Sequence, residues 1–372
     1  MTARGKRQLT ICLNMIVKDE SRVIRRCLDT VRPWIDHWVI VDTGSTDGTQ
    51  GIIREQLKDI PGELHERPWK DFGHNRTEAL ELAKGKAVYT LVIDADEVLI
   101  VEPGFEMPLL DADAYQTLHL VGDSGTSFYL TNIVHEALDW RYVGVLHEAI
   151  TCDSPHAIEK LEGIVVKGLF DGARNTDPKK KYEQDAAVLE AALAGEPDNA
   201  RYVFYLAQCY RDAGQLEASL EAYERRVAMG GWAEEVWYAL YQIAVLGERL
   251  GGDFAPALEA YLRAHQYRPQ RAEPLCQLAR HYRQNDDYAL AHLFANEAMA
   301  IPRPADILFL DDSVYDWRAL DEYAISAYWV GNFEGGLKAN DRLLEEGKLP
   351  ISEQERVEAN KSFCVEQLRK GV

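Results

Sequence analysis

The first half of the chain alternates short apolar runs with amphipathic stretches. A continuous apolar run is typical of a strand that is buried on both faces, whereas apolar residues three and four apart indicate one buried face of a helix. These patterns predict strands at 10–17, 38–41 and 88–93 and helices at 21–31, 49–57 and 75–83. Strands and helices in alternation predict a doubly wound, mostly parallel sheet.

The second half of the chain has a different rhythm. Beyond Asp177 the strand-like runs stop, and apolar residues follow helical spacing. Aromatic residues, small residues and turn glycines recur at intervals of about 34 to 38 residues, the period of helix-pair repeats. We predict four tetratricopeptide-like helix pairs, in which small residues let helices cross and aromatic residues fill the gaps. A joining helix at 179–193 and a capping helix at 353–368 would flank them.

A stretch rich in turn formers, at 172–178, separates the two halves. We therefore predict two domains, at 1–175 and 176–372. The first is an α/β domain with a doubly wound sheet, and the second is an all-α repeat domain. The chain has 372 residues, of which 47% are hydrophobic and 27% are charged, so each domain can bury a core of its own.

Composition narrows the setting and the partners. No apolar run is long enough to cross a bilayer, and the basic start of the chain lacks a cleavage-site pattern, so we expect neither a transmembrane segment nor a signal peptide. Six cysteines are scattered without a Cys-x-x-Cys pair, which predicts reduced thiols, a cytoplasmic protein and no zinc framework. The net charge of −20 divides about evenly between the halves and disfavours nucleic acid as a partner.

The residues that could do chemistry gather where predicted strands end. Asp94 and Asp96 follow the strand at 88–93, at the edge where α/β sheets bind ligands. Two carboxylates at alternate positions can hold a divalent cation, which in turn grips a diphosphate. Asp42 ends the strand at 38–41, where it could bond a ribose hydroxyl or the imide edge of uracil, while we assign Asp47 to helix capping. Together these residues predict a nucleotide-sugar site.

Two common nucleotide motifs are missing from the sequence. The turn after Asp42 has neither the Gly-x-Gly-x-x-Gly spacing of dinucleotide-binding folds nor the Gly-Lys-Ser/Thr of a phosphate loop. Oxidoreductases and P-loop nucleotidases are therefore disfavoured.

Five segments carry a family resemblance. Four of them resemble, in order, the motifs of family 2 glycosyltransferases, which have the GT-A fold: 14–20, 41–49, 71–80 and 93–98. The segment 141–148 resembles the Gly-x-x-His-Glu motif of a bacterial subgroup with tetratricopeptide repeats, to which the sublancin S-glycosyltransferase is similar. The resemblance covers residues 9–235 well and the later repeats by pattern alone. It implies a nucleoside-diphosphate sugar donor, a Mn²⁺ or Mg²⁺ ion and inversion at the anomeric carbon.

The resemblance also implies roles for single residues of the donor site. Asp42 would face the uridine, as would Val17 or its neighbours through backbone groups. Arg76 would approach the diphosphate or hold the loop of Asp42, and the alternative is an exposed arginine at a helix start. Asp94 would reach the ribose or a metal-bound water, and Asp96 would bind the metal.

The resemblance further implies a metal ligand and a base downstream. His147 would be an additional metal ligand, because imidazole suits Mn²⁺. Glu148 would take the acceptor proton as general base, with Glu136 and Asp153 as lesser candidates. If this segment is extended, His147 and Glu148 point to opposite sides. We expect the histidine at the metal and the glutamate at the acceptor.

The function expected from the sequence is inverting transfer of a hexose from a UDP-sugar to a peptide or protein side chain docked by the repeats. Three alternatives to this function stay open: a lipopolysaccharide or capsule glycan transferase, a phage-type transferase that acts on modified DNA bases, and a non-catalytic repeat scaffold. The nucleophile of the acceptor is open as well, and a thiol would need less help from a base than a hydroxyl. The sequence leaves the oligomeric state open, a homodimer included.

Overall fold

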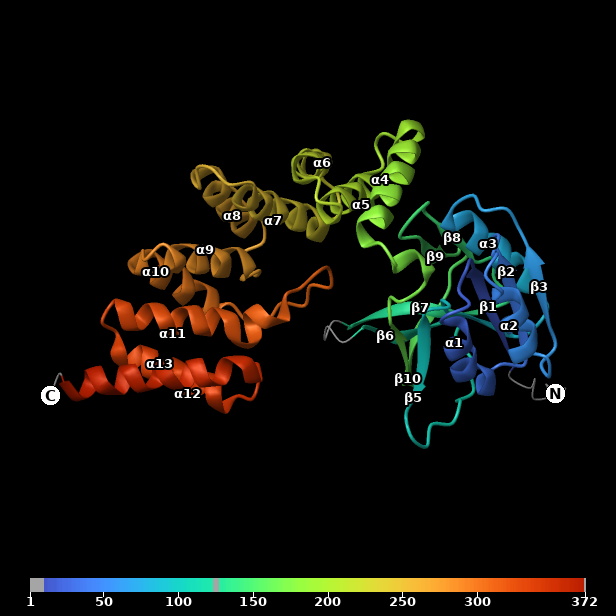
Figure 1. The fold of residues 1–372 in the computed structure, drawn as a ribbon, viewed down its shortest axis with the longest axis horizontal. Helices are drawn as coiled ribbons and strands as arrows, with labels where there is room; N and C mark the ends of the chain where they lie inside the picture. The colour runs from blue at the N-terminus through green and yellow to red at the C-terminus, as the bar shows by residue number, and fades with distance from the viewer. Residues whose placement is uncertain (1–9, 123–126, 371–372) are drawn as a thin grey trace. The chain divides into compact units, whose positions relative to one another are not determined.

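The computed structural model describes residues 10–122 and 127–370, which form two compact units (Figure 1). The units divide between Gly195 and Glu196, twenty residues beyond the boundary expected from the turn-rich stretch. The physical reason is that helix α4 (Pro178–Gly195) belongs with the sheet. Its Asp185 is paired with Arg174 of the short 3₁₀ helix η2 (Ala173–Asn175), which leads directly out of the sheet.

The N-terminal unit is built on one mixed sheet. In the described residues this sheet has eight strands in the order β3-β2-β1-β4-β7-β6-β10-β5. Their bounds are β1 Ile11–Val17, β2 His37–Asp42, β3 Gly62–Glu66, β4 Tyr89–Val92, β5 Glu97–Val101, β6 Ala114–Val121, β7 Ser127–His135 and β10 Ile158–Gly168. β7 runs antiparallel to β4 and β6, and β5 antiparallel to β10, whereas the other neighbours are parallel. A separate hairpin joins β8 (Arg141–Val143) and β9 (Ala149–Thr151).

Helices cover both faces of this sheet. α1 (Ile24–Val31), α2 (Thr49–Gln56) and α3 (Phe72–Ala83) alternate with the first strands, as the apolar pattern predicts. α1 buries its apolar face against the main core, whereas Leu80 of α3 packs with Val92 and Val134 on the other side. The strand β3 was not predicted, because Gly-Glu-Leu-His-Glu is too polar to read as a buried run.

The C-terminal unit is an array of helix pairs, and Figure 1 shows the successive pairs. The bounds are α5 Ala200–Asp212, α6 Leu216–Met229, α7 Ala233–Leu250, α8 Ala255–Tyr267, α9 Glu273–Gln284, α10 Tyr288–Ala300, the π-helix η3 Val314–Arg318, α11 Ala319–Trp329, α12 Phe333–Glu345 and α13 Ile351–Lys370. Small residues such as Ala207 and Ala279 are fully buried where helices meet, and Tyr223, Trp237 and Tyr261 fill the gaps. The predicted sheet, four helix pairs, joining helix and capping helix are confirmed.

All six cysteines are buried free thiols. Within the described residues, no helix combines the length and the apolar character that crossing a membrane requires.

Candidate active site

Asp42 is the last residue of β2 and has no exposed surface. Its Oδ1 accepts the backbone N–H groups of Gly44 at 2.8 Å and Ser45 at 2.7 Å, while Oδ2 is buried without a hydrogen-bond partner. Val17 ends β1 opposite Asp42, and its carbonyl already accepts the N–H of Thr43 at 2.9 Å. A buried carboxylate oxygen without a donor is costly, so Oδ2 of Asp42 is an unsatisfied acceptor at this edge of the sheet.

The loops after β1 and β2 are tied to each other. Asp19 accepts the N–H of Thr46 at 2.8 Å. Asp47 binds both the N–H and the hydroxyl of Thr49, and its other oxygen accepts the N–H of Ser21 at 2.9 Å. The N-cap of α2 is Gly48, so Asp47 is not the capping residue itself, but from the preceding position it binds the first residue of the helix and cross-links the two loops. These bonds hold the loop around Asp42 in place before any ligand binds.

Arg76 connects two of the expected site residues. Its Nη2 lies 2.6 Å and 2.9 Å from the two carboxylate oxygens of Asp94. Its Nε lies 2.6 Å from Oε1 of Glu148, in an ion pair whose N–H is not aligned for a hydrogen bond. The Arg76 side chain is only 11% exposed, so the alternative of an exposed helix-start arginine is wrong. Its described contacts also go to Asp94 and Glu148 rather than to the loop of Asp42.

The buried ion pairs change the titration of these groups. Burial would lower the pKa of Arg76, but the charges of Asp94 and Glu148 raise it above its ordinary value. Burial also raises the pKa of Glu148, and Arg76 partly opposes that shift. The arginine thus stays charged and holds the two carboxylates on either side of it.

The β8–β9 hairpin brings Glu148 to Arg76 by packing on α3. The hydroxyl of Thr77 accepts the N–H of Tyr142 at 2.9 Å. A Cβ at Gly73 would lie 2.3 Å from the carbonyl oxygen of Gly144, so only glycine allows this close approach. Both glycines stand in segments that the resemblance singles out, 71–80 and 141–148, but nothing in the sequence indicates that the two meet.

The segment that carries His147 is not extended. Residues 144–147 form a bend, and His147 has φ of +50°, in the left-handed region. The expectation that His147 and Glu148 point apart because they are neighbours on an extended segment is therefore wrong. Within the described residues, no three or more His, Cys, Asp or Glu side chains form a group that could hold a metal. A metal role for His147 with Asp96 stays a prediction.

Asp96 has neighbours that the sequence did not reveal. Its Oδ2 accepts Nδ2 of Asn175 at 3.4 Å, and Glu20 Oε2 accepts the N–H of Ala173 at 3.2 Å. A Cβ on Gly172 would lie 3.0 Å from Asp96 Oδ2 and 3.1 Å from Glu20 Oε2, so the two carboxylates converge on one point. Burial, followed by the charge of Asp96 and other acids, raises the pKa of Glu20 to about 7. Burial and neighbouring acids likewise raise the pKa of Asp96.

Only part of this group could have been found from the sequence. Glu20 ends the segment 14–20 and could have been singled out there. Gly172, Ala173 and Asn175 lie in the turn-rich stretch after the last strand, where no motif marks them.

The two lesser candidates for the base make their described contacts elsewhere. Glu136 donates its N–H to the carbonyl of Val88 and accepts the N–H of Gly85, which places it at the amino end of β4, the opposite edge from Asp94. Asp153 is paired with Arg141 on the surface, and its side chain is 84% exposed. Of the three candidates, Glu148 is the one beside the other site residues.

Comparison with known proteins identifies the N-terminal unit. Residues 12–104 match the sequence model of glycosyl transferase family 2. The chain contains a family 2 glycosyltransferase domain. This domain includes Val17, Asp42, Arg76, Asp94 and Asp96 within the matched residues, whereas His147 and Glu148 follow it. Its mixed sheet is GT-A-like, as the resemblance implied.

Two curated relatives and one solved structure are similar to stretches of this chain. A TPR repeat-containing protein of Synechococcus elongatus is 29% identical over 312 residues, 79% of this chain and 75% of the relative. The SPbeta prophage-derived glycosyltransferase SunS of Bacillus subtilis is 25% identical over 213 residues, 53% of this chain and 48% of that protein, so the match spans about half its length. A tetratricopeptide repeat protein from Parabacteroides merdae shares 19% identity, with a TM-score of 0.37, over 52% of this chain and 69% of that chain. The family and the SunS relative support glycosyl transfer as the chemistry of the sheet unit.

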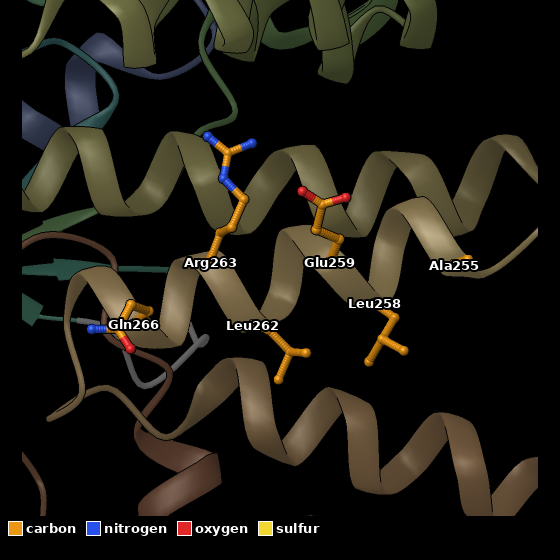
Figure 2. Close-up of a pocket in the computed structure, with 6 residues that line it drawn as sticks. All are labelled: Ala255, Leu258, Glu259, Leu262, Arg263 and Gln266. Atoms are coloured by element: carbon orange, nitrogen blue, oxygen red, sulfur yellow. The ribbon is translucent and has the colours of Figure 1, made fainter.

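The repeat unit carries a hollow along α8 that is separate from these residues. Figure 2 shows that Leu258 and Leu262 point to one side of the helix and Glu259 and Arg263 to the other. The hollow contains none of the expected site residues, and its lining comes from one helix. It therefore adds nothing to the candidate active site.

Proposed function

We propose that the protein is an inverting glycosyltransferase that moves a hexose from a UDP-sugar to a peptide or protein side chain docked by its repeats. The observation that carries the proposal is the buried Oδ2 of Asp42, which lacks a donor. The imide N–H of uracil would supply that donor. Because Oδ1 is fixed by two backbone N–H groups, the carboxylate is already oriented for the nucleotide.

The acidic residues beside Asp42 fit a Mn²⁺ or Mg²⁺ ion. Asp96 and Glu20 would hold it, since their carboxylate oxygens converge over Gly172. Mg²⁺ in nucleotide sites is commonly bound by one or two carboxylates together with substrate phosphates and water, so a group of three protein ligands is not required. When bound, the cation would offset the charge of the diphosphate leaving group.

Glu148 is our proposed general base, and Arg76 would position it. The acceptor proton must pass to a carboxylate on the side of the sugar away from the diphosphate. Burial favours the protonated form of Glu148 and so strengthens it as a base, while Arg76 limits that shift. Because the same arginine binds Asp94, the base would be held at a fixed distance from the donor end of the site.

The donor is the most direct thing to test. Calorimetry with UDP and GDP, each in Mn²⁺ and in EDTA, should show tight binding of UDP with Mn²⁺ that weakens markedly in EDTA. Equal affinity for UDP in both conditions would remove the cation from the proposal, and preference for GDP would change the donor. Hydrolysis of a panel of UDP-sugars by the full chain then identifies the hexose, and the product's anomeric configuration by NMR tests inversion.

A further inference from the structure

A segment of the repeat unit lies across three of its helix pairs. Residues 302–311, between α10 and η3, contain neither helix nor strand. Within them, residues 306–309, here called the strap, alternate between more and less buried positions, and Ile307 is 80% exposed. Such alternation is what an extended peptide shows when it lies on a surface.

Side chains of the helices hold the backbone of the strap. Glu234, in the first turn of α7, accepts the N–H groups of Ile307 at 2.9 Å and Leu308 at 2.8 Å on the same oxygen, Oε2. Arg271, just before α9, donates to the carbonyl oxygens of Leu308 at 3.3 Å and Phe309 at 3.1 Å. Contacts to main-chain groups accept any extended segment, whatever its side chains.

Two strap side chains meet pockets of their own. The carboxylate of Asp306 is paired with Arg268 and, at 3.4 Å, with Arg271. The ring of Phe309 lies 4.7 Å from that of Tyr238 on α7 and 6.2 Å from that of Phe204 on α5. The helices therefore offer two arginines to the carboxylate of Asp306 and two aromatic rings to the ring of Phe309. Extended residues three apart point to opposite faces, so it is the left-handed φ of Phe309 that lets both side chains meet the same surface.

The strap is held by hydrogen bonds and contacts to these side chains, and not by backbone–backbone hydrogen bonds. Among the described residues, no backbone–backbone hydrogen bond outside the helices and strands involves residues 302–310. Phe309 has φ of +44°, in the left-handed region that costs a non-glycine residue free energy. The same ring remains 46% exposed. Release of the strap would therefore relieve backbone strain and break no main-chain pairing.

We infer that five residues of the helices form a binding groove for a peptide segment that has a carboxylate three residues before an aromatic ring and that turns at this ring: Phe204, Glu234, Tyr238, Arg268 and Arg271. The strap occupies this groove as a resident ligand, and an incoming segment of the same chemistry replaces it. A tethered ligand has a high effective concentration, so the incoming segment must compete with the strap. One part of the inference rests on the proposed function: the incoming segment is taken to belong to the acceptor of glycosyl transfer.

A labelled peptide with the sequence of residues 303–312, Arg-Pro-Ala-Asp-Ile-Leu-Phe-Leu-Asp-Asp, tests the groove. Its binding to the full chain is measured by fluorescence anisotropy, without donor or transfer. The double variant Asp306→Ala, Phe309→Ala, which weakens the strap, should bind the peptide at least about tenfold more tightly than the unaltered chain. Ile307→Ala, which changes an exposed side chain of the same strap, should bind like the unaltered chain. Adding Glu234→Ala to the double variant should abolish the gain.

Two results would overturn the inference: a folded double variant that gains no affinity, or a gain that survives Glu234→Ala. Circular dichroism establishes whether the double variant folds. If it does not, hydrogen exchange of the unaltered chain decides. The amides of Ile307 and Leu308 should exchange faster than those in the middle of α7, whereas exchange only through global unfolding would overturn the inference. Because the readout is peptide binding, its failure leaves the donor-site proposal standing, and loss of UDP binding leaves the groove standing.

Discussion

A buried ion pair of the repeats and the carboxylates at the edge of the sheet treat charge in opposite ways. In the repeats, Arg226 is 1% exposed and two of its nitrogens bind Glu235, at 2.9 Å and 3.1 Å, so each buried charge has its counterpart. At the edge of the sheet, the carboxylates of Glu20 and Asp96 converge, and Asp42 keeps an oxygen without a donor. A buried charge that is paired within the protein belongs to the structure, whereas one that is left uncompensated indicates a place for a ligand.

The strongest test of this comparison removes half of a compensated pair. Arg226→Ala should lower the free energy of unfolding of the repeat unit by about 3 to 5 kcal/mol, because it leaves Glu235 charged and buried without a partner. Urea denaturation followed by circular dichroism measures the change. Arg225→Ala is the matched control, since Arg225 is the exposed neighbour on the same helix and should cost less than about 1 kcal/mol. Equal losses in the two variants would show that the buried pair is not structural.

The second test concerns the carboxylate that shares Arg76. Glu148→Gln should cut turnover by roughly 10²-fold or more, the scale of general-base catalysis, and leave UDP affinity within a few-fold. Steady-state kinetics and UDP calorimetry measure the two effects. Asp153→Asn, on the exposed end of the same hairpin, should leave both unchanged. If Glu148→Gln instead loses UDP binding, the residue acts on the donor through Arg76 and Asp94 rather than on the acceptor.

The sequence predicted the elements of this site better than their contacts. Strand ends could be placed because apolar runs stop at Asp42 and just before Asp94, and the edge of a parallel sheet collects such residues. The contact between Arg76 and Glu148 could not be predicted. It depends on a hairpin that packs on α3 through Gly73 and Gly144, and periodicity carries no information on such packing. The bend at His147 could not be predicted for a similar reason, because no residue near it in the sequence indicates a positive φ at a histidine.

In the repeats the situation is reversed. Residues such as Ala207 and Tyr223 recur at a fixed period, so their burial could be predicted from the sequence alone. The strap could not, because residues 306–309 lie outside the repeat pattern and are held by side chains far away in the sequence, such as Glu234. Packing that repeats at a fixed period can be predicted from a sequence, whereas contacts outside the repeat pattern cannot.

The third test replaces the uncompensated carboxylate. Asp42→Asn should weaken UDP binding by roughly 10- to 100-fold, because the amide presents a donor where the imide N–H of uracil needs an acceptor. Its stability should stay unchanged or rise, since a buried charge with an unused oxygen is removed. Calorimetry and urea denaturation measure both. Asp59→Asn, at an exposed position on the same unit, serves as control. Unchanged UDP affinity in Asp42→Asn would contradict the uridine role.

The smallest expected effect is the pH dependence of folding stability in the absence of divalent cations. The pKa shift of Glu20 in the sheet unit and that of Glu248 in the repeat unit have opposite signs. Burial and the charges of Asp96 and Asp94 raise the pKa of Glu20 from 4.5 to about 7. The folded sheet unit therefore binds a proton more tightly than the unfolded chain, and its stability should fall as pH rises from about 4.5 to about 7. In the repeats, burial would raise the pKa of Glu248, but its bonds to His281 and Arg280 lower it below the ordinary value.

Stability from Glu248 is therefore present above pH 4.5 and should be lost as pH falls below that value. Native-state hydrogen exchange in EDTA, corrected for the intrinsic pH dependence of exchange, reports on β1 and α9 separately. Between about pH 4.5 and about 7, β1 should lose protection, and Glu20→Gln should flatten that slope. Glu55→Gln, an exposed glutamate of the same unit, should not. A sheet unit that gains stability over this window would mean that the carboxylates at its edge are compensated after all, and the contrast with the repeats would disappear.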